Sequence, residues 1–131
     1  MTDRSCVVDA SAVLAWLFRE RGDDAVERIL HVAVISAVNL GEVLYRAAGE
    51  GMRIETLAAD LEAYGLETVP FTSEDAPLLE EMRRAARRQK VTVSLGDCCC
   101  LATAVRLGLP VVGGDQPWER LRIGVDIHPI R

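Results

Sequence analysis

Residues 6–18 read CVVDASAVLAWLF: an apolar triplet ends at Asp9, and a stretch that is apolar nearly all round follows at once. The triplet predicts a short buried strand, and the stretch from Ala10 predicts a buried helix. The same change recurs where the β-branched run Val32–Ile35 stops at Ser36, a favoured helix N-cap residue. A strand that passes directly into a helix, twice near the start of the chain, favours an α/β fold.

The remaining chain continues this alternation of short strands and helices. Helices are expected at Ala10–Phe18, Asp23–Leu30, Ala37–Gly49, Ile54–Tyr64, from Ser73 to Arg88 and at Ser94–Leu107, with strand-like runs at Thr68–Val69, Val91–Val93, Pro110–Gly113 and Val125–Pro129. Short apolar strands without polar alternation are typical of a parallel sheet covered on both faces. With 131 residues, the chain is predicted to form a single domain over residues 1–131, a three-layer α/β/α sandwich with a mainly parallel sheet.

Composition excludes several classes of protein. Half of the residues are hydrophobic and 27% are charged, so the chain is neither disordered nor fibrous. The longest stretch without a formal charge, residues 29–41, is shorter than a membrane-spanning helix requires. No uninterrupted apolar segment of a signal peptide follows the N-terminus. We therefore expect a cytoplasmic protein with no membrane partner.

The four cysteines indicate neither a disulfide framework nor a zinc site. Cys98–Cys100 are consecutive in a predicted helix, where their side chains point in different directions. No pair of cysteines is matched by a pair of histidines at the spacing of a zinc site. We interpret all four as small buried residues in a reducing compartment.

Four acidic side chains are expected at one edge of the predicted sheet. Asp9 and Asp115 directly follow strands, and Glu42 and Asp97 lie in the early turns of two helices. The carboxyl ends of parallel strands and the N-termini of the crossover helices share one edge, and ligands bind there. The four carboxylates should therefore converge, in a chain whose net charge of −5 argues against nucleic-acid binding by bulk electrostatics alone.

Each of these acids also has an ordinary structural explanation. Asp9 would cap the helix that follows it, and Asp97 would form a capping box with Ser94. Glu42 would form an ion pair with Arg46 within one helix, and Asp115 would be a turn residue. One residue at a time, these explanations are favoured. They do not explain why all four acids fall at one edge.

Carboxylates that lie close together imply a cation. Negative charges within a few ångströms repel each other, so either some of the groups stay protonated or a cation lies among them. Mg²⁺ and Mn²⁺ prefer oxygen ligands, and a metal-bound water is a nucleophile suited to phosphodiester hydrolysis. The chain has none of the motifs of α/β-hydrolases, P-loop proteins, dinucleotide-binding proteins or zinc metalloproteases.

Four short stretches carry a resemblance to a known family. They are VDAS at 8–11, SAVNLGEV at 36–43, SLGD at 94–97 and GDQPW at 114–118. In order and spacing they resemble the PIN-domain ribonucleases, in particular the VapC-like toxins of bacterial toxin–antitoxin pairs, and the likeness spans nearly the whole chain. At Gly113 the chain departs from many relatives, which carry Thr or Ser two residues before the fourth acid, and this departure weakens the expectation of a second metal ion.

The resemblance implies an endoribonuclease that requires Mg²⁺ or Mn²⁺ and cleaves structured RNA, often transfer RNA, by attack of water. It implies that the catalytic and metal-binding residues are Asp9, Glu42, Asp97 and Asp115. Asp9 and Asp97 match best, whereas Glu42 would orient water or complete the metal's coordination. The resemblance also implies a homodimer and a small cognate antitoxin that lies across the acidic site.

Neighbouring residues are expected to support the acids or to contact RNA. Ser11 and Asn39 are placed to hydrogen-bond two of the acids, or else are ordinary caps, and Arg46 and Arg53 lie near the predicted site as possible RNA contacts. A further run of cations comprises Arg83, Arg84, Arg87, Arg88 and Lys90. Two explanations of this run stay open: it contacts an RNA backbone, or it complements the dipole at the end of its helix.

Two other functions remain as alternatives. A phosphoacceptor receiver domain has a similar length and magnesium-binding acids, but it needs a lysine at the end of a late strand and an acidic pair after the first strand. Here Lys90 precedes a predicted strand and Asp9 has no acidic neighbour. The second alternative is a catalytically idle PIN-like module that only binds a partner or RNA.

Overall fold

The computed structural model describes residues 3–131 and has a five-stranded sheet at its centre. The strands are β1 (Cys6–Val8), β2 (Ala33–Ser36), β3 (Glu67–Val69), β4 (Val111–Val112) and β5 (Ile127–His128). They lie in the order β3-β2-β1-β4-β5, and every pairing is parallel. The predicted parallel sheet is confirmed, and the strand expected within residues 125–129 is β5 at its edge.

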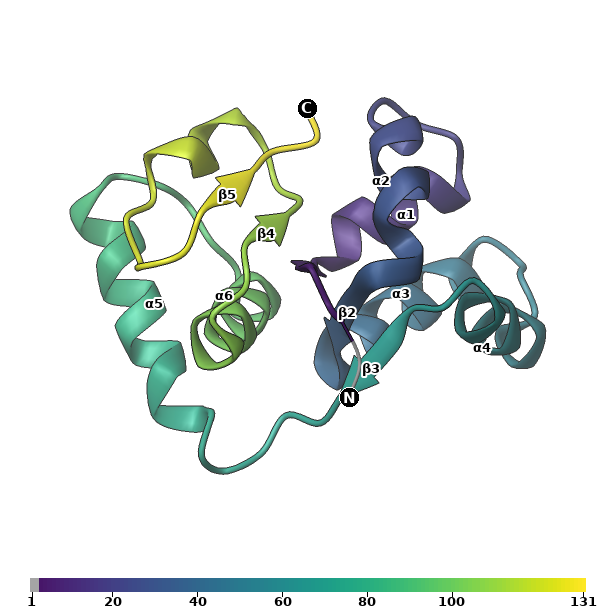
Figure 1. Cartoon of the computed structure of the whole chain (residues 1–131), viewed down its shortest axis with the longest axis horizontal. Coiled ribbons are helices and arrows are strands. Elements are labelled where there is room, and N and C mark those ends of the chain that lie inside the picture. Colours follow the sequence, from purple (N-terminus) through teal and green to yellow (C-terminus); the bar gives the residue numbers. More distant parts are fainter. Residues whose placement is uncertain (1–2) are drawn as a thin grey trace.

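Helices connect these strands on both sides of the sheet (Figure 1). They are α1 (Ala10–Leu17), α2 (Asp23–Ile29), α3 (Ala37–Gly49), α4 (Ile54–Ala63), α5 (Ala76–Arg88) and α6 (Leu95–Leu107), with short 3-10 turns η1 (Leu30–Val32) and η2 (Gln116–Arg120). Figure 1 shows α1 to α4 on one side and α5 and α6 on the other. Within residues 3–131, none of the helices has the length and apolar content needed to cross a membrane.

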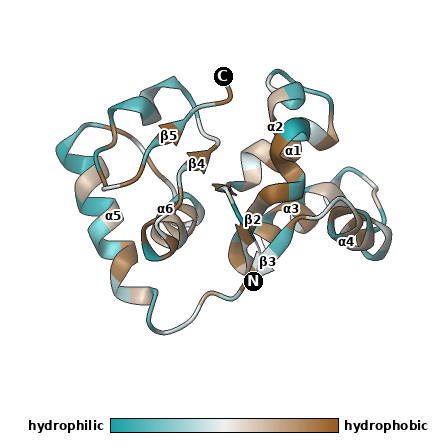
Figure 2. Cartoon of the chain, in the orientation of Figure 1, coloured by the Kyte–Doolittle hydropathy of each residue, from teal (hydrophilic) through white to brown (hydrophobic). Residues whose placement is uncertain are grey.

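The sheet separates two apolar clusters. Val8 and Ile35 pack with residues of α1 to α4, whereas Val7 and Val34 pack with residues of α5 and α6. Successive residues of a strand point to opposite faces, and here both faces are buried. Figure 2 shows α5 with both polar and apolar residues, as expected of a helix that covers a sheet with one face. The predicted three-layer α/β/α architecture is confirmed.

The strand order reverses between β1 and β4. From β1 the chain proceeds outwards through β2 to β3, and it then crosses to the other side of β1 to form β4 and β5. Ligands of such sheets bind beyond the carboxyl ends of the strands at the reversal point. Asp9 directly follows β1, and Gly113 and Gly114 directly follow β4, so the fold places these residues at that point.

Two expectations for the segments around α5 are wrong. Val91–Val93 form no strand. The Val91 N–H donates to the Ala86 carbonyl at 2.9 Å, and the chain passes from α5 to α6 without entering the sheet. The helix expected from Ser73 begins at Ala76. Pro77 has no N–H to donate to a carbonyl four residues earlier, and therefore proline is tolerated only in the first turn of the helix.

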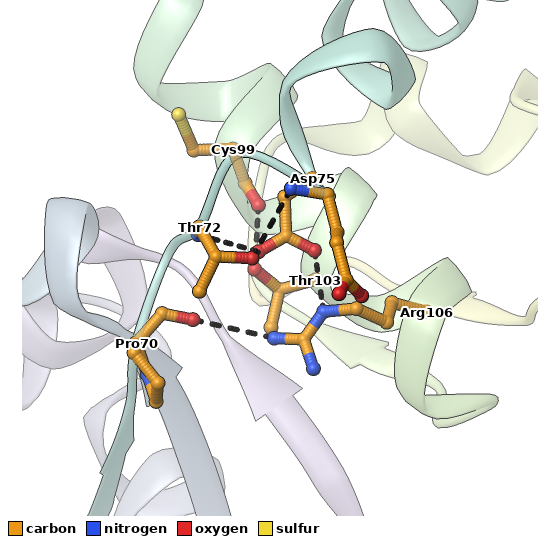
Figure 3. Close-up of polar contacts among 7 residues, drawn as sticks. Pro70, Thr72, Asp75, Cys99, Thr103 and Arg106 are labelled. Carbon is orange, nitrogen blue, oxygen red and sulfur yellow. Dashed lines mark hydrogen bonds and ion pairs between the residues drawn. The ribbon is translucent and has the colours of Figure 1, made fainter.

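A buried ion pair holds the start of α5 against α6 (Figure 3). The Asp75 side chain is fully buried, and one of its oxygens lies 2.5 Å from Arg106 Nε. The other oxygen accepts a hydrogen bond from the Thr72 N–H at 2.9 Å, and Arg106 Nη2 donates to the Pro70 carbonyl at 3.3 Å. These contacts fix the connection between β3 and α5 to the last turn of α6.

Candidate functional site

A pocket of about 640 Å³ lies at the carboxyl edge of the sheet. Its walls come from the start of α1, the middle of α3 and the start of α6, and thus from both layers of helices. The polar residues around it include Ser11, Glu42, Arg46, Asp97 and Arg131. Two of the predicted acids therefore line this pocket, and a third is hydrogen-bonded to Ser11 in its wall.

That third acid, Asp9, is buried and caps α1. Its Oδ1 accepts a hydrogen bond from the Ala12 N–H at 2.9 Å, and the Ser11 hydroxyl lies 2.9 and 2.8 Å from the two carboxyl oxygens. Burial raises the pKa of Asp9 to about 6; the bonds from Ser11 and Ala12 lower the pKa, the Asp97 charge raises it and the Arg131 charge lowers it. The expected Ser11–Asp9 contact is confirmed. A nearby cation would stabilise the ionised form of this carboxyl group.

Asp97 lies in the first turn of α6 and completes a capping box. Its N–H donates to Ser94 Oγ at 3.0 Å, and its Oδ2 accepts from the Ser94 N–H at 2.9 Å. Within residues 3–131 its other oxygen has no hydrogen-bond partner, and the side chain lines the pocket. The capping and metal-binding interpretations of Asp97 are therefore compatible, because they use different oxygens.

Glu42 is held by Asn39 instead of by Arg46. Asn39 Nδ2 donates to Glu42 Oε1 at 2.7 Å and to the Gly96 carbonyl at 2.9 Å, so one buried amide joins α3 to the start of α6. The expected Asn39–Glu42 contact is confirmed. No ion pair joins Glu42 to Arg46 in the part of the chain that the structure describes.

Asp115, the fourth predicted acid, is an exposed residue paired with an arginine. Its side chain is 69% exposed, and its Oδ1 lies 3.2 Å from Arg131 Nε. Arg131 lines the pocket, but Asp115 does not. The buried Trp118 ring lies against Gly114, and the Trp118 N–H donates to the Asp115 carbonyl at 2.9 Å. Trp118 therefore anchors the turn that carries Asp115.

Two glycines make room for the carboxyl groups, a role that the sequence analysis did not predict. A Cβ atom on Gly113 would collide with the Asp9 carboxyl group, and one on Gly96 would collide with the Glu42 carboxyl group. The φ of Gly113 is 153°, where residues with a side chain are disfavoured. A glycine directly after a strand at the ligand edge is the signal that points to such a close approach.

The cations and the aromatic residue near the pocket differ in their placement. Arg46 lines the pocket, whereas Arg53 is exposed before α4 and is not among the residues around it. Tyr45, which the sequence analysis also missed, lines the pocket beside Arg46 and is 81% exposed. Exposed aromatic rings next to cations are typical of surfaces on which nucleic-acid bases stack.

The pocket fits Mg²⁺ or Mn²⁺ that is bound partly through water. No three His, Cys, Asp or Glu side chains between residues 3 and 131 form a group that could hold a metal ion, so the expected four-carboxylate cluster is not assembled. Mg²⁺ commonly uses one or two carboxylates and keeps several waters, which suits the two acids that line the pocket, Glu42 and Asp97. Asn39 Oδ1, on the amide that holds Glu42, is buried and has no hydrogen-bond partner among residues 3–131.

Comparison with known proteins identifies what the chain is similar to. The sequence model described as PIN domain matches residues 6–123. No curated protein matches. Similar solved structures include DNA-bound VapBC from Salmonella typhimurium, with 20% identity, coverage of 98% of this chain and 99% of that chain, and a TM-score of 0.70. A toxin–antitoxin complex from Klebsiella pneumoniae has 16% identity, coverage of 94% and 100%, and a TM-score of 0.71. VapBC-5 from Mycobacterium tuberculosis has 21% identity, coverage of 97% and 98%, and a TM-score of 0.58. At these identities the likeness shows a shared fold.

Proposed function

The chain belongs to the PIN-domain family, and from this premise we propose that it is a Mg²⁺- or Mn²⁺-dependent endoribonuclease of the VapC toxin kind. Its substrate class is structured RNA, and transfer RNA is the first candidate. One observation carries the proposal: Glu42 and Asp97 line one pocket at the edge where the strand order reverses, and Asp9 is hydrogen-bonded to Ser11 of the same pocket.

In this proposal the metal ion supplies a water that ionises near neutral pH and a positive charge that stabilises the leaving oxygen. Asp9 and Asp97 are the candidate direct ligands, and Glu42 orients a water or completes the coordination. Ser11 and Asn39 hold Asp9 and Glu42 in place through hydrogen bonds.

The two cations of the pocket act on the substrate. Arg46 and Arg131 line the pocket and are the candidate contacts to phosphate oxygens, to which guanidinium groups donate strong hydrogen bonds. Asp115, the fourth acid, pairs with Arg131 and so sets the position of this cation. Arg53 would contact only an RNA segment that extends beyond the pocket.

We also infer that a small cognate antitoxin covers the pocket and that the chain forms a homodimer. The shared fold with VapBC and toxin–antitoxin complexes over nearly the whole chain supports the antitoxin partner, and the homodimer rests on the resemblance of the sequence motifs alone. The four cysteines are free and buried, as expected in a reducing compartment, and on this ground we place the reaction in the cytoplasm.

The test is cleavage of labelled total transfer RNA by the purified protein with Mg²⁺, with Mn²⁺ and with EDTA. Wild type should cleave only with metal, and Asp9→Asn and Asp97→Asn should each lose at least about 100-fold in activity, because each removes a candidate ligand charge. Asp60→Asn removes an exposed acid of α4 outside the pocket and should cleave normally.

Cleavage in EDTA, or full cleavage by both site variants, would contradict this proposal. RNA binding without cleavage under any metal condition would identify a catalytically idle binding module instead.

A further inference from the structure

Cationic side chains gather at the end of α5. We define the α5 patch as six exposed residues, Arg84, Arg87, Arg88, Lys90, Arg120 and Arg122. None of the six has an ion pair within residues 3–131, whereas the adjacent Arg83 is held by Glu80 through two hydrogen bonds. Besides Glu80, the acids of α5 and η2 are Glu81 and Glu119. The patch is therefore positive, although the net charge of the chain is −5.

Two segments that are far apart in the sequence build the α5 patch. Arg120 Nη2 donates to the Lys90 carbonyl at 2.9 Å, and the Arg122 N–H donates to Gln89 Oε1 at 2.8 Å. These bonds fix the η2 segment against the end of α5. The helix dipole favours cations in the last turn of α5, but it does not explain the cations that the η2 segment brings to the same place.

Lys90 adopts a backbone conformation that is costly for a lysine. Its φ is 58°, in the left-handed region that glycine usually occupies after a helix. A residue with a side chain costs about 1–2 kcal/mol in this region. Arg19 has a similar φ of 55° after α1, so the strain alone assigns no function to Lys90, and what this exposed residue adds here is its positive charge.

The α5 patch adjoins the acidic pocket. Arg87 and Lys90 line a hollow of about 520 Å³ that also includes residues 91–93. The chain continues from these residues directly into Ser94, which lines the acidic pocket together with Asp97. An RNA strand with one phosphate at the acidic pocket can therefore follow the surface of residues 91–94 to the patch.

We propose that the α5 patch binds backbone phosphates of the RNA strand whose scissile phosphate lies in the acidic pocket. This inference rests on the proposed function and names the surface that would hold its substrate. The carboxylates of the pocket repel a polyanion, so a strand that enters the pocket needs cations beside it. Contacts between phosphates and Lys or Arg release counterions, and the binding should therefore weaken steeply as the salt concentration rises.

The test is the binding of a fluorescent single-stranded RNA, followed by anisotropy in EDTA on the Asp97→Asn background at several salt concentrations. The double variant Lys90→Gly/Arg87→Gln removes two charges of the patch. Glycine suits the left-handed backbone at position 90, so this variant should melt at or near the temperature of the parent protein. Arg28→Gln removes one exposed arginine of α2, on the other side of the sheet, and is the control for a positive charge lost outside the patch.

We expect the double variant to bind RNA roughly fivefold or more weakly at about 0.1 M salt, with a salt-dependence slope reduced by about 1.4, because each phosphate contact to a single strand contributes about 0.7. Arg28→Gln should leave both quantities unchanged. If the double variant keeps the RNA affinity and the salt-dependence slope of the parent protein, the inference is overturned. A loss confined to duplex DNA, measured in a parallel series, would also overturn it.

The cleavage assay separates this inference from the proposed function. If wild type cleaves RNA while the double variant binds RNA normally, the α5 patch assignment alone fails. If the double variant loses RNA affinity but wild type never cleaves with Mg²⁺ or Mn²⁺, the nuclease proposal alone fails.

Discussion

The Asp9 carboxyl group serves a helix and the candidate site at the same time. It caps α1 through the Ala12 N–H, yet it is almost fully buried and its pKa is raised to about 6. Asparagine caps helices as well as aspartate does, so the cap alone does not require a negative charge. The charge at this position therefore opposes stability and is better explained by the site than by the helix.

Asp9→Asn should stabilise the metal-free protein at high pH. The pKa of Asp9 in the folded protein, about 6, lies above its ordinary value of 3.8, so the folded state binds the proton more tightly. This contribution to stability is present below about pH 4 and is lost as the pH rises through 6. The stability of the variant relative to wild type should therefore increase by about 1–2 kcal/mol from pH 5 to pH 8.

Urea unfolding in EDTA at the two pH values measures this change. Asp60→Asn, which removes an exposed carboxylate, should show no comparable increase. A difference between Asp9→Asn and wild type that is independent of pH would show that Asp9 is already ionised at pH 5.

At the scale of the element, the helix starts could be predicted because their signals are local. Ser36 and Ser94 cap α3 and α6 as expected, through hydrogen bonds to N–H groups two or three residues away. The segment Val91–Val93 shows where local signals fail. Its β-branched residues suit a strand and a half-buried connection alike, and the partner strand that would decide between them lies elsewhere in the sequence.

Local sequence patterns also did not predict the ion pair between Asp75 and Arg106. This pair joins the start of α5 to α6, and its contribution to stability can be tested by mutation. Arg106→Met leaves a fully buried carboxylate without a counter-charge and should cost about 3–5 kcal/mol of stability. Asp75→Asn keeps an acceptor for the Thr72 N–H and leaves a partly exposed arginine that water can solvate, so it should cost about 1–2 kcal/mol.

Urea unfolding followed by circular dichroism compares the two variants. Arg28→Met, at an exposed arginine of α2, is the control and should stay within about 0.5 kcal/mol of wild type. If Asp75→Asn proved the more harmful change, the buried carboxylate would not depend on Arg106 for its stability (Figure 3).

At the scale of the whole molecule, the sequence patterns predict the edge that carries the site but not the distances within it. Alternating strands and helices imply a parallel sheet, and a parallel sheet collects strand ends and helix starts at one edge. Asp115 follows a strand just as Asp9 does. Its pairing with Arg131, however, depends on where β5 leads the chain, which no pattern around Asp115 reveals.

A divalent cation should stabilise the entire domain. Glu42 belongs to α3 and Asp97 to α6, and these helices pack into opposite apolar clusters, so a bound ion would tie the two layers together. At a metal concentration ten times Kd, the gain is about 1.4 kcal/mol. For a domain of this size that corresponds to a rise in Tm of about 3–5 °C.

Thermal melting with Mn²⁺ and with EDTA measures this rise. Asp97→Asn should show a smaller rise, and Asp60→Asn should respond as wild type does. A wild-type Tm that is insensitive to millimolar Mn²⁺ would speak against metal binding at the pocket, whatever the RNA assays show.

Gly113 contributes to the pocket through what it lacks. With only a hydrogen as its side chain, it leaves free the space that the Asp9 carboxyl group occupies. Because glycine has no reactive side chain, a search for catalytic groups would not select Gly113. Alanine is usually a mild replacement in a mutational scan. At this position its methyl group would displace the Asp9 carboxyl group, so the substitution should be among the most damaging.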